Sequence, residues 1–335
     1  MDKITILTEP VLTKKELLIK NIKHILFILK RLISGQSSFV LPPKKQPYGG
    51  HFAVTRSLTE GLKKLGADFN YNPKRVSGIN ENVVVLSNTE ALKQCITLKN
   101  QQKIKKLLAG PNLFILPSDC KELITDPAVD ICIVNSLWNE KVYIEDSPEL
   151  TGKTAIWPAG VDTGYFNPKK PADERKYVMI YEKNGPGDLI AQCKDFLRSS
   201  GYSTLTVRFG SYSVREFSEN LQNSKVSVFF SRSESQGIAL AEAWASDVPT
   251  LVWNPGVYTL YENTGRAKTV NVSSAPYLTA ETGLFFRDFE SFKEVFSEWE
   301  SSPGAFNARR WVIENMSDEL CAAKLTKLIH GGEQA

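Results

Sequence analysis

Two glutamates in the second half of the chain have the type and spacing to bind hydroxyl groups. Glu234 and Glu242 stand eight residues apart in the stretch FFSRSESQGIALAEAWASDVPTLVW. The pattern predicts a strand, a turn that holds Glu234, a helix that holds Glu242, and a second strand. Eight residues are close to two helical turns, so both carboxylates would lie on nearly the same face and could accept hydrogen bonds from a sugar and a ribose. The alternative is that both are solvated helix residues.

The backbone between the two glutamates has the features of an anion site. Ser235, Gln236, Gly237 and Ile238 lie where the predicted helix begins. The first N–H groups of a helix have no partner within it, and the helix dipole favours negative charge there. The stretch therefore indicates a diphosphate site with a sugar on one side and a nucleoside on the other.

Strands and helices alternate along most of the chain, which predicts parallel sheets with helices on both faces. The first set has predicted strands around residues 82–88, 112–118, 130–136 and 153–161, and predicted helices around 51–66, 89–110 and 137–145. The second set has predicted strands around residues 177–184, 203–210 and 225–233, and predicted helices around 187–201 and 213–224. The predicted fold class is therefore α/β, with two doubly wound sheets.

A proline-containing, charged stretch, GVDTGYFNPKKPADERK, separates the two sets and is typical of an interdomain linker. We predict a first domain over residues 1–165, a second over 166–305, and a C-terminal helix over 306–335 that crosses back to the first domain. Ligands of such sheets bind beyond the carboxyl ends of the strands. The cleft between the two domains is therefore the expected site.

The composition is that of an ordinary globular protein, with 335 residues, of which 42% are hydrophobic and 23% charged. Five scattered cysteines without a CxxC pair argue against a disulfide framework and a zinc site, and they fit a reducing compartment. The opening residues MDKITILTEPVL do not resemble a signal peptide, and no apolar run reaches the ~18–20 residues of a membrane span. We therefore expect a cytoplasmic protein.

The basic charge is concentrated near the N-terminus. Residues 1–45 hold nine Lys and Arg against three acidic residues, whereas the remainder holds 32 basic and 34 acidic residues. This asymmetry argues against a general nucleic-acid surface. Residues 14–33 form a predicted amphipathic helix with two interpretations. It is either a core-packed helix with a solvated basic face or a peripheral helix that contacts anionic lipid at the inner face of the membrane.

The E-x7-E spacing of the two glutamates resembles the signature of retaining GT-B glycosyltransferases, in the group 1 or family 4 class. Three more segments are similar to parts of that family, in the same order: YGGHFAVTRSLTEGLKKLG, WPAGVDTGYFNP and SAPYLTAETGLFF. The matches span residues 48–286. The resemblance implies two Rossmann-like domains with a cleft between them and C-terminal helices. It also implies a hexosyltransferase that uses a nucleotide-diphosphate sugar and retains the anomeric configuration.

The resemblance gives a role to each matching residue. Glu234 would contact the donor sugar, Glu242 would bind the ribose hydroxyls, and the backbone of residues 235–238 would hold the diphosphate. Gly49 and Gly50 would let a main-chain loop approach the same phosphates, where a Cβ would clash.

Lys183 is the basic residue that the resemblance implies beside the leaving diphosphate. It follows the first predicted strand of the second domain, and it would stabilise the negative charge that develops on the leaving group. The alternative for this lysine is a solvated surface position. The resemblance implies no metal ion, and no cofactor is expected besides the nucleotide-sugar donor substrate.

The chain also departs from the family pattern. The family has an arginine beside that lysine, and here Arg208 and Arg215 are both candidates to replace it. Asp247 stands where the family usually has a glycine. His51 is a candidate for the family's sugar-contacting histidine, with a structural role as the alternative. Tyr212 is a further candidate for ligand contact.

The predicted function is transfer of a sugar to a hydroxyl of a glycan or glycolipid acceptor, in polysaccharide or glycolipid biosynthesis. The donor would bind mostly to the second domain, and the acceptor would enter from the first. One alternative is a nucleotide-sugar epimerase of the same fold, which needs no acceptor. Another is a non-catalytic glycan-binding or scaffold protein on a GT-B frame, which predicts no nucleotide binding; the missing arginine and Asp247 favour it.

Overall fold

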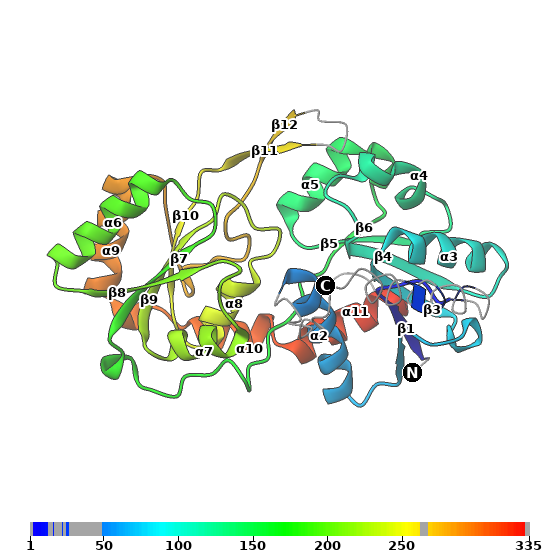
Figure 1. Cartoon of the computed structure of the whole chain (residues 1–335), viewed down its shortest axis with the longest axis horizontal. Coiled ribbons are helices and arrows are strands. Elements are labelled where there is room, and N and C mark those ends of the chain that lie inside the picture. The colour runs from blue at the N-terminus through cyan, green and yellow to red at the C-terminus, as the bar shows by residue number, and fades with distance from the viewer. Residues whose placement is uncertain are drawn as a thin grey trace.

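The computed structural model describes residues 3–12, 16, 22, 25–26, 49–261 and 267–331. The chain forms two lobes that lie side by side (Figure 1). The first lobe is built on a six-stranded sheet and the second on a five-stranded sheet. The predicted helix over residues 14–33 lies almost wholly outside the described residues, so its two interpretations both stay open.

Both sheets are parallel throughout, with strand orders β2-β1-β3-β4-β5-β6 and β13-β10-β9-β7-β8. The strands of the first lobe are β1 (Ile4–Leu7), β2 (Phe69–Tyr71), β3 (Asn82–Ser87), β4 (Lys106–Asn112), β5 (Ile131–Val134) and β6 (Thr154–Ile156). The strands of the second lobe are β7 (Tyr177–Glu182), β8 (Ser203–Arg208), β9 (Ser224–Phe230), β10 (Thr250–Trp253) and β13 (Gly283–Phe286). The predicted α/β fold class is confirmed.

Helices cover both faces of each sheet. The first lobe has α2 (Gly50–Lys64), α3 (Thr89–Asn100), α4 (Lys121–Ile124), α5 (Leu137–Asp146) and α11 (Asp318–Ile329). The second lobe has α6 (Gly187–Ser199), α7 (Val214–Gln222), α8 (Ile238–Ala245), α9 (Phe289–Ser301) and α10 (Ala308–Asn315). Among the residues that the structure describes, no helix combines the length and apolar character that a bilayer crossing requires.

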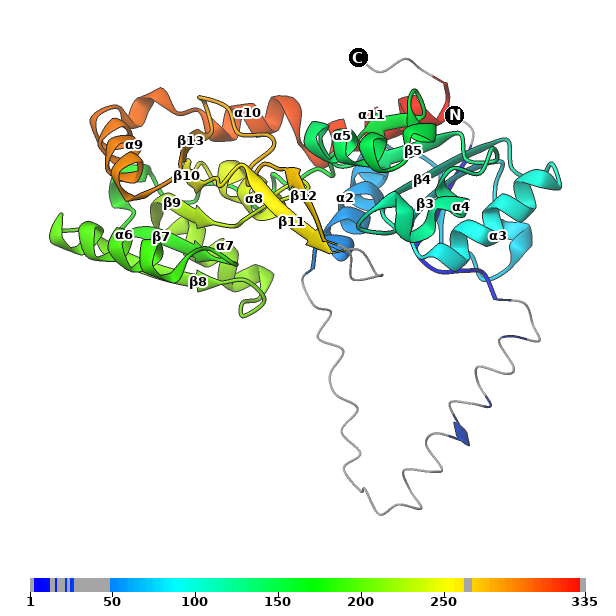
Figure 2. The ribbon, with the colours of Figure 1, turned by 90° about the horizontal axis from the view of Figure 1, so that it is seen from above.

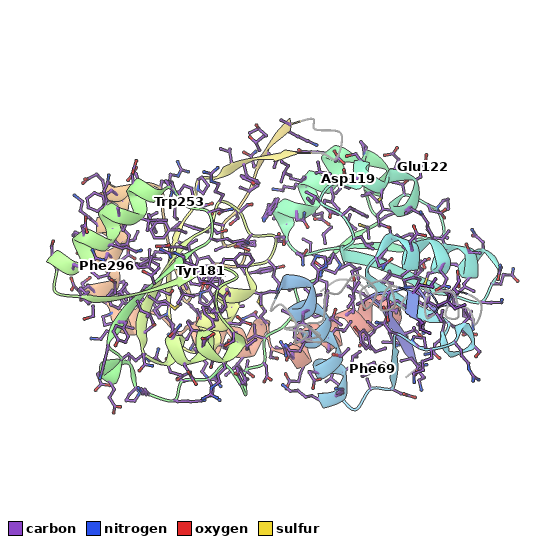
Figure 3. The ribbon with its side chains drawn as sticks, viewed as in Figure 1. Phe69, Asp119, Glu122, Tyr181, Trp253 and Phe296 are labelled. Carbon is purple, nitrogen blue, oxygen red and sulfur yellow. The ribbon has the colours of Figure 1, made fainter. Side chains whose placement is uncertain are left out.

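The strand sequences explain why both faces of each sheet are covered. Residues 83–86 of β3 are all fully buried, and a strand buried on both faces needs such a continuous apolar run. In the second lobe, Tyr181 of β7 belongs to the apolar cluster formed with α7 and α8. Trp253 of β10 and Phe296 of α9 belong to the cluster on the opposite face (Figure 3).

The helix α11 packs on α2 of the first lobe although it follows the second lobe in sequence (Figure 1). Arg56 of α2 donates two hydrogen bonds to the carboxylate of Asp318, at 2.7 and 3.1 Å. Gly61 permits the close approach, because a Cβ there would lie 2.3 Å from the Asp318 carbonyl oxygen. The chain passes between the sheets after β6 and before β7; the boundaries at 165/166 and 305/306 stay predictions.

A β-hairpin that was not predicted from the sequence connects the two lobes. Its strands β11 (Val257–Tyr261) and β12 (Ala267–Asn271) pair antiparallel and lie between β10 and β13 in sequence. This β11–β12 hairpin reaches from the second lobe to α5 of the first (Figure 2). Val270 and Val272 are buried there with Val142 of α5.

The strand β4 lies earlier in the chain than predicted. The helix expected over residues 89–110 ends at Asn100, and residues 106–112 form β4. The strand expected over residues 112–118 is mostly loop and a short 3₁₀ turn. The local sequence is compatible with a helix, and pairing of β4 with β3 and β5 overrides that local preference.

Candidate functional site

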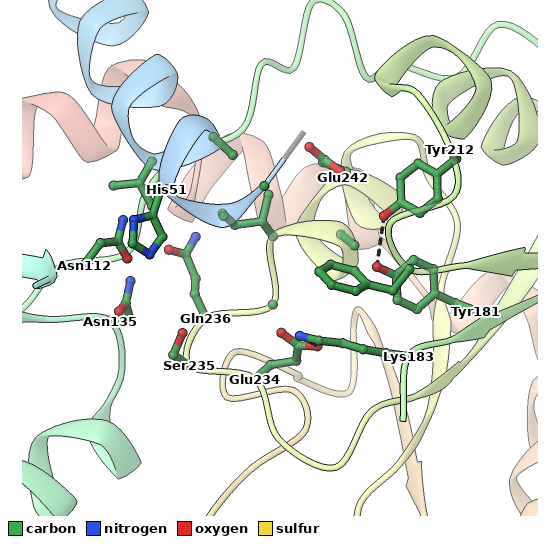
Figure 4. Close-up of a pocket in the computed structure, with 18 residues that line it drawn as sticks. His51, Asn112, Asn135, Tyr181, Lys183, Tyr212, Glu234, Ser235, Gln236 and Glu242 are labelled. Carbon is green, nitrogen blue, oxygen red and sulfur yellow. Dashed lines mark hydrogen bonds and ion pairs between the residues drawn. The ribbon is translucent and has the colours of Figure 1, made fainter. Parts of the chain in front are cut away.

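A cavity of about 240 Å³ lies between the two lobes, at the carboxyl ends of strands from both sheets (Figure 4). We call it the first pocket. The predicted donor-binding and catalytic residues line it, together with two of the further candidates: Gly49, Gly50, His51, Lys183, Tyr212, Glu234, Ser235, Gln236, Gly237, Ile238 and Glu242. The fold therefore brings four separated stretches of sequence to one cavity.

The start of α8 faces the first pocket without a side-chain cap. Gly237, the residue before the helix, has a φ of 84°, in the left-handed region that favours glycine. Because no side chain caps this helix, its first N–H groups are available to a ligand. The helix dipole adds partial positive charge at the same point, so this end of the pocket favours an anion.

Lys183 and Glu234 form an ion pair within the first pocket. Lys183 Nζ donates to Glu234 Oε1 at 2.9 Å, and the Ser231 hydroxyl donates to the same oxygen at 2.7 Å. The ammonium also lies 4.8 Å from the ring centroid of Phe209, in cation–π range. Glu234 and Phe209 therefore both restrain the lysine, which lines the cavity rather than extending into bulk solvent.

Glu242 is 2% exposed, and its Oε2 has no hydrogen-bond partner among the described residues. Burial, reinforced by the nearby Asp318 carboxylate, raises the pKa of Glu242 well above its ordinary value. The neutral carboxyl group is therefore favoured, and it can both donate and accept a hydrogen bond. A buried polar atom without a partner, at the wall of a cavity, is suited to a ligand hydroxyl.

The turn before α8 also holds the two lobes together. The Gln236 side chain accepts a hydrogen bond from the Ala159 N–H at 2.9 Å and donates one to the Ala159 carbonyl at 2.6 Å. Trp138 Nε1 of α5 donates to the Glu234 carbonyl at 2.9 Å. The Gln236 amide is thus engaged with the first lobe, although the residue lines the pocket.

Neither arginine considered as a partner for Lys183 lines the first pocket. Arg208 pairs with Glu182 at 3.1 Å and its side chain is 73% exposed. Arg215 pairs with Glu219 at 2.7 Å and its side chain is 83% exposed. Among the described residues that line this cavity, Lys183 is therefore the one lysine, and there is no arginine.

Asp247 lies beyond the other end of α8, away from the first pocket. It has a φ of 56°, and an L-residue rarely adopts this left-handed conformation unless it is Asn or Asp. The backbone thus accommodates aspartate in place of the glycine, and Asp247 does not line the first pocket.

Seven residues that line the first pocket were not predicted from the sequence, and the four of them with polar or aromatic side chains are Asn112, Asn135, Tyr181 and Phe209. Asn112 ends β4 and Asn135 follows β5, so the rule that ligands bind at carboxyl ends of strands could have found both. Asn112 was missed because β4 was misplaced. Phe209 directly follows β8 and could have been found by the same rule.

Polar side chains of the two lobes face each other across the first pocket. In Figure 4, His51, Asn112 and Asn135 lie together on the first-lobe side. Tyr181 and Tyr212 lie on the second-lobe side, with their hydroxyl groups 2.9 Å apart. Burial raises the pKa of both tyrosines, so they remain neutral hydrogen-bonding groups.

No protein-family model and no curated protein sequence matches the chain. Solved structures also match, and three of them do so over nearly the full length of both chains. A glycosyltransferase from Rickettsia africae has a TM-score of 0.58 and 13% identity, with 99% of this chain and 100% of that chain covered. The apo form of the lipopolysaccharide outer core galactosyltransferase WaaB has a TM-score of 0.55 and 10% identity, covering 98% and 99%. AviGT4, a glycosyltransferase involved in avilamycin A biosynthesis, has a TM-score of 0.51 and 12% identity, covering 99% of each chain. The chain thus has the GT-B fold, with two Rossmann-like parts.

Proposed function

We propose that the protein is a glycosyltransferase that moves a sugar from a nucleotide-diphosphate donor to an acceptor hydroxyl. The observation that carries the proposal is the uncapped, glycine-led start of α8, which lies between Glu234 and Glu242 in one cavity. A diphosphate at that helix start would have one glutamate beside its sugar and the other beside its ribose. The GT-B fold and its similarity to glycosyltransferases support the same function.

Each residue of the proposed donor site has a physical task. Glu242, which burial keeps neutral, binds the ribose hydroxyls without repelling the diphosphate. The N–H groups at the start of α8 and the Lys183 ammonium bind the phosphate oxygens. Glu234 accepts hydrogen bonds from the donor sugar, while Gly49 and Gly50 let the backbone of the first lobe come close.

The transfer step breaks the bond between the anomeric carbon and the diphosphate oxygen, whose electron pair leaves with the nucleoside diphosphate. A bond forms between the anomeric carbon and the acceptor oxygen, and the proton of the acceptor hydroxyl is released to the leaving diphosphate or water. Lys183 stabilises the negative charge that develops on the leaving group. We propose that the lysine and the helix start fill the role of a metal ion, so that no metal is required.

We propose retention of the anomeric configuration, on the strength of the E-x7-E spacing, and an acceptor that is a glycan or glycolipid of a biosynthetic pathway. The anomeric configuration of the new glycosidic bond tests this, because a glycoside does not mutarotate, and its anomeric proton coupling can be read by NMR. A product with the same anomeric configuration as the donor is expected. An inverted product would reject retention without rejecting glycosyl transfer.

Nucleotide binding is the first test of the proposed function. UDP, GDP, ADP and dTDP, each with and without EDTA, are added to the protein, and the thermal unfolding midpoint is recorded. One of them is expected to raise the midpoint whether or not EDTA is present, because a ligand that binds only the folded state stabilises it. The absence of any shift would favour a non-catalytic protein, and conversion of the donor sugar to its epimer without an acceptor would favour an epimerase.

The variant Lys183→Met sharpens this test. Loss of a charge-assisted hydrogen bond of about 1.5–3 kcal/mol should weaken binding of the nucleoside diphosphate roughly tenfold to hundredfold. Binding of the nucleoside without phosphates should stay unchanged, as isothermal titration calorimetry can measure. Arg215→Ala is the matched control, because it removes a cation outside the first pocket. Equal losses for both variants would contradict the assigned role of Lys183.

A further inference from the structure

We propose that a second cavity, next to the first pocket, binds the acceptor through an uncharged ring, and that the β11–β12 hairpin helps to select that acceptor. The inference rests on the proposed glycosyl transfer. It goes further by assigning a chemical class to the acceptor and a specificity role to a segment of the lobe that would hold the donor.

The second cavity, which we call the second pocket, has a volume of about 420 Å³. It shares four lining residues with the first pocket: His51, Asn112, Asn135 and Ser235. Its size is in the range of small-molecule sites. A molecule in the second pocket would therefore lie directly beside the group bound in the first, as an acceptor must lie beside a donor sugar.

The walls of the second pocket combine amide groups with aromatic rings. Asn112, Asn135 and Asn139 supply side-chain amides, each of which can both donate and accept hydrogen bonds. Phe114 and Trp138 supply flat apolar surface. This combination suits a sugar or similar ring, whose hydroxyl groups form hydrogen bonds and whose C–H faces pack on aromatic rings.

The charge of the side chains that line the second pocket indicates which class of acceptor it can bind. Within the described part of the chain, the second pocket is lined by no Lys, Arg, Asp or Glu. Apart from the His51 imidazole, a phosphate or carboxylate in it would gain no basic side-chain partner from these residues, and an unpaired charge costs several kcal/mol. The part of the acceptor that binds in the second pocket is therefore uncharged.

The β11–β12 hairpin brings a side chain of the second lobe to the second pocket. Leu260 of β11 lines it and packs with Leu116 and Val142 of the first lobe. Lys268 of β12 pairs with Asp146 at the end of α5, with 3.5 Å between Nζ and Oδ1. These contacts fix the hairpin on α5, so the second pocket is complete only when the two lobes are together.

The role of Leu260 predicts an effect on the acceptor alone. Replacing Leu260 by the larger Trp should fill part of the second pocket and raise the acceptor KM at least tenfold. Hydrolysis of the donor without acceptor, and the thermal shift with the nucleoside diphosphate, should both stay unchanged. Val257→Ala is the matched control, because Val257 lies in the same strand but is 52% exposed and outside the pocket.

A binding experiment that needs no donor tests the class of acceptor. Saturation-transfer NMR of the full chain is recorded with neutral methyl hexosides, methyl glucuronide and glucose 6-phosphate. The neutral hexosides are expected to give signals that Leu260→Trp and, from the opposite wall, Phe114→Ala both weaken. Preference for a charged ligand, or neutral binding that both variants leave unchanged, would overturn the proposal.

The two proposals fail in different ways. If no nucleoside diphosphate binds, the proposed function fails and this inference falls with it. If a nucleoside diphosphate binds and the donor is hydrolysed, but the acceptor KM does not respond to Leu260→Trp, only the acceptor assignment is wrong. If Leu260→Trp does not fold, the effect of Phe114→Ala on the acceptor KM tests the acceptor assignment independently.

Discussion

The carboxyl group of Glu242 is buried, and burial disfavours its charged form. Its raised pKa means that the folded protein holds a proton at pH values where the unfolded chain has lost it. The stability from this group is therefore fully present below about the ordinary value of 4.5 and is lost as the pH rises through the raised pKa. Asp318, whose pKa burial also raises, contributes in the same direction.

We predict that Glu242→Gln removes the contribution of this one carboxyl group to the pH dependence. The free energy of unfolding should differ little between the two proteins near pH 4.5 and should increasingly favour the variant as the pH rises to 8. Each unit of pKa difference corresponds to about 1.36 kcal/mol. Urea titrations at several pH values measure this. Asp318 is present in both proteins, so the difference reports Glu242 together with its interaction with the Asp318 carboxylate. Parallel pH profiles would contradict the prediction.

Site residues were predictable from the sequence where their position depends on their neighbours in the chain. The start of α8 was predictable because Ser235 to Ile238 carry their own turn and helix signals. Asn135 and Phe209 follow strands that the sequence did identify, and attention to strand ends would have found them. The bond from Gln236 to Ala159 could not be predicted, because it joins residues that only the packing of the two lobes brings together.

Gly61 is a point of close approach between α2 and α11, which lie far apart in the sequence. In an exposed helix, Gly→Ala would gain about 1 kcal/mol from helix propensity. Here the new Cβ would lie 2.3 Å from the Asp318 carbonyl oxygen and 2.7 Å from the Ala322 Cβ, so α11 must move away from α2. Overpacking of this kind typically costs about 1–3 kcal/mol.

We therefore predict that Gly61→Ala lowers the free energy of unfolding by about 1 kcal/mol or more, despite its better helix propensity. Chemical denaturation measures the change. Gly187→Ala at the start of α6 is the control, because a Cβ there has no atom within 4 Å. A variant at Gly61 that is as stable as the control variant would show that the two helices can separate at no cost.

Elements with a clear local pattern were predictable, and elements defined by partners were not. The sequence identified α2 and β3 through apolar periodicity and a continuous apolar run. It missed β4, whose conformation depends on neighbouring strands, and the β11–β12 hairpin, which is stabilised by contacts with the other lobe. For β4, local propensity gave way to tertiary pairing, whereas the VYTLY segment of β11 carries β-branched and aromatic residues, a strand signal that was missed.

At the scale of the whole molecule, two hydrogen bonds to residues that line the first pocket join the two lobes. Trp138 donates to the Glu234 carbonyl, and the Tyr277 hydroxyl donates to the Asn135 carbonyl at 2.5 Å. Each bond is worth about 1 kcal/mol. Their combined loss, about 2 kcal/mol, would shift an equilibrium between closed and open lobes roughly thirtyfold towards the open form.

We predict that the double variant Trp138→Phe/Tyr277→Phe has a larger radius of gyration than the parent protein, measured by small-angle X-ray scattering. Water would then enter the cavity more readily, so the ratio of sugar transfer to donor hydrolysis should fall. Trp253→Phe is the matched control, because its indole donates to the Arg287 carbonyl within the second lobe. A double variant with the parent radius and the parent ratio would contradict this account.

The position of α11 also constrains the order of folding during synthesis on the ribosome. The sheet of the first lobe is complete at residue 156, but the helix that covers one of its faces together with α2 begins at Asp318. Ala322, Leu325 and Leu328 of α11 belong to the apolar core of that lobe. During synthesis, these apolar contacts of α11 can therefore form only after the whole second lobe has been translated, and until then the face of the sheet on which α11 packs lacks them.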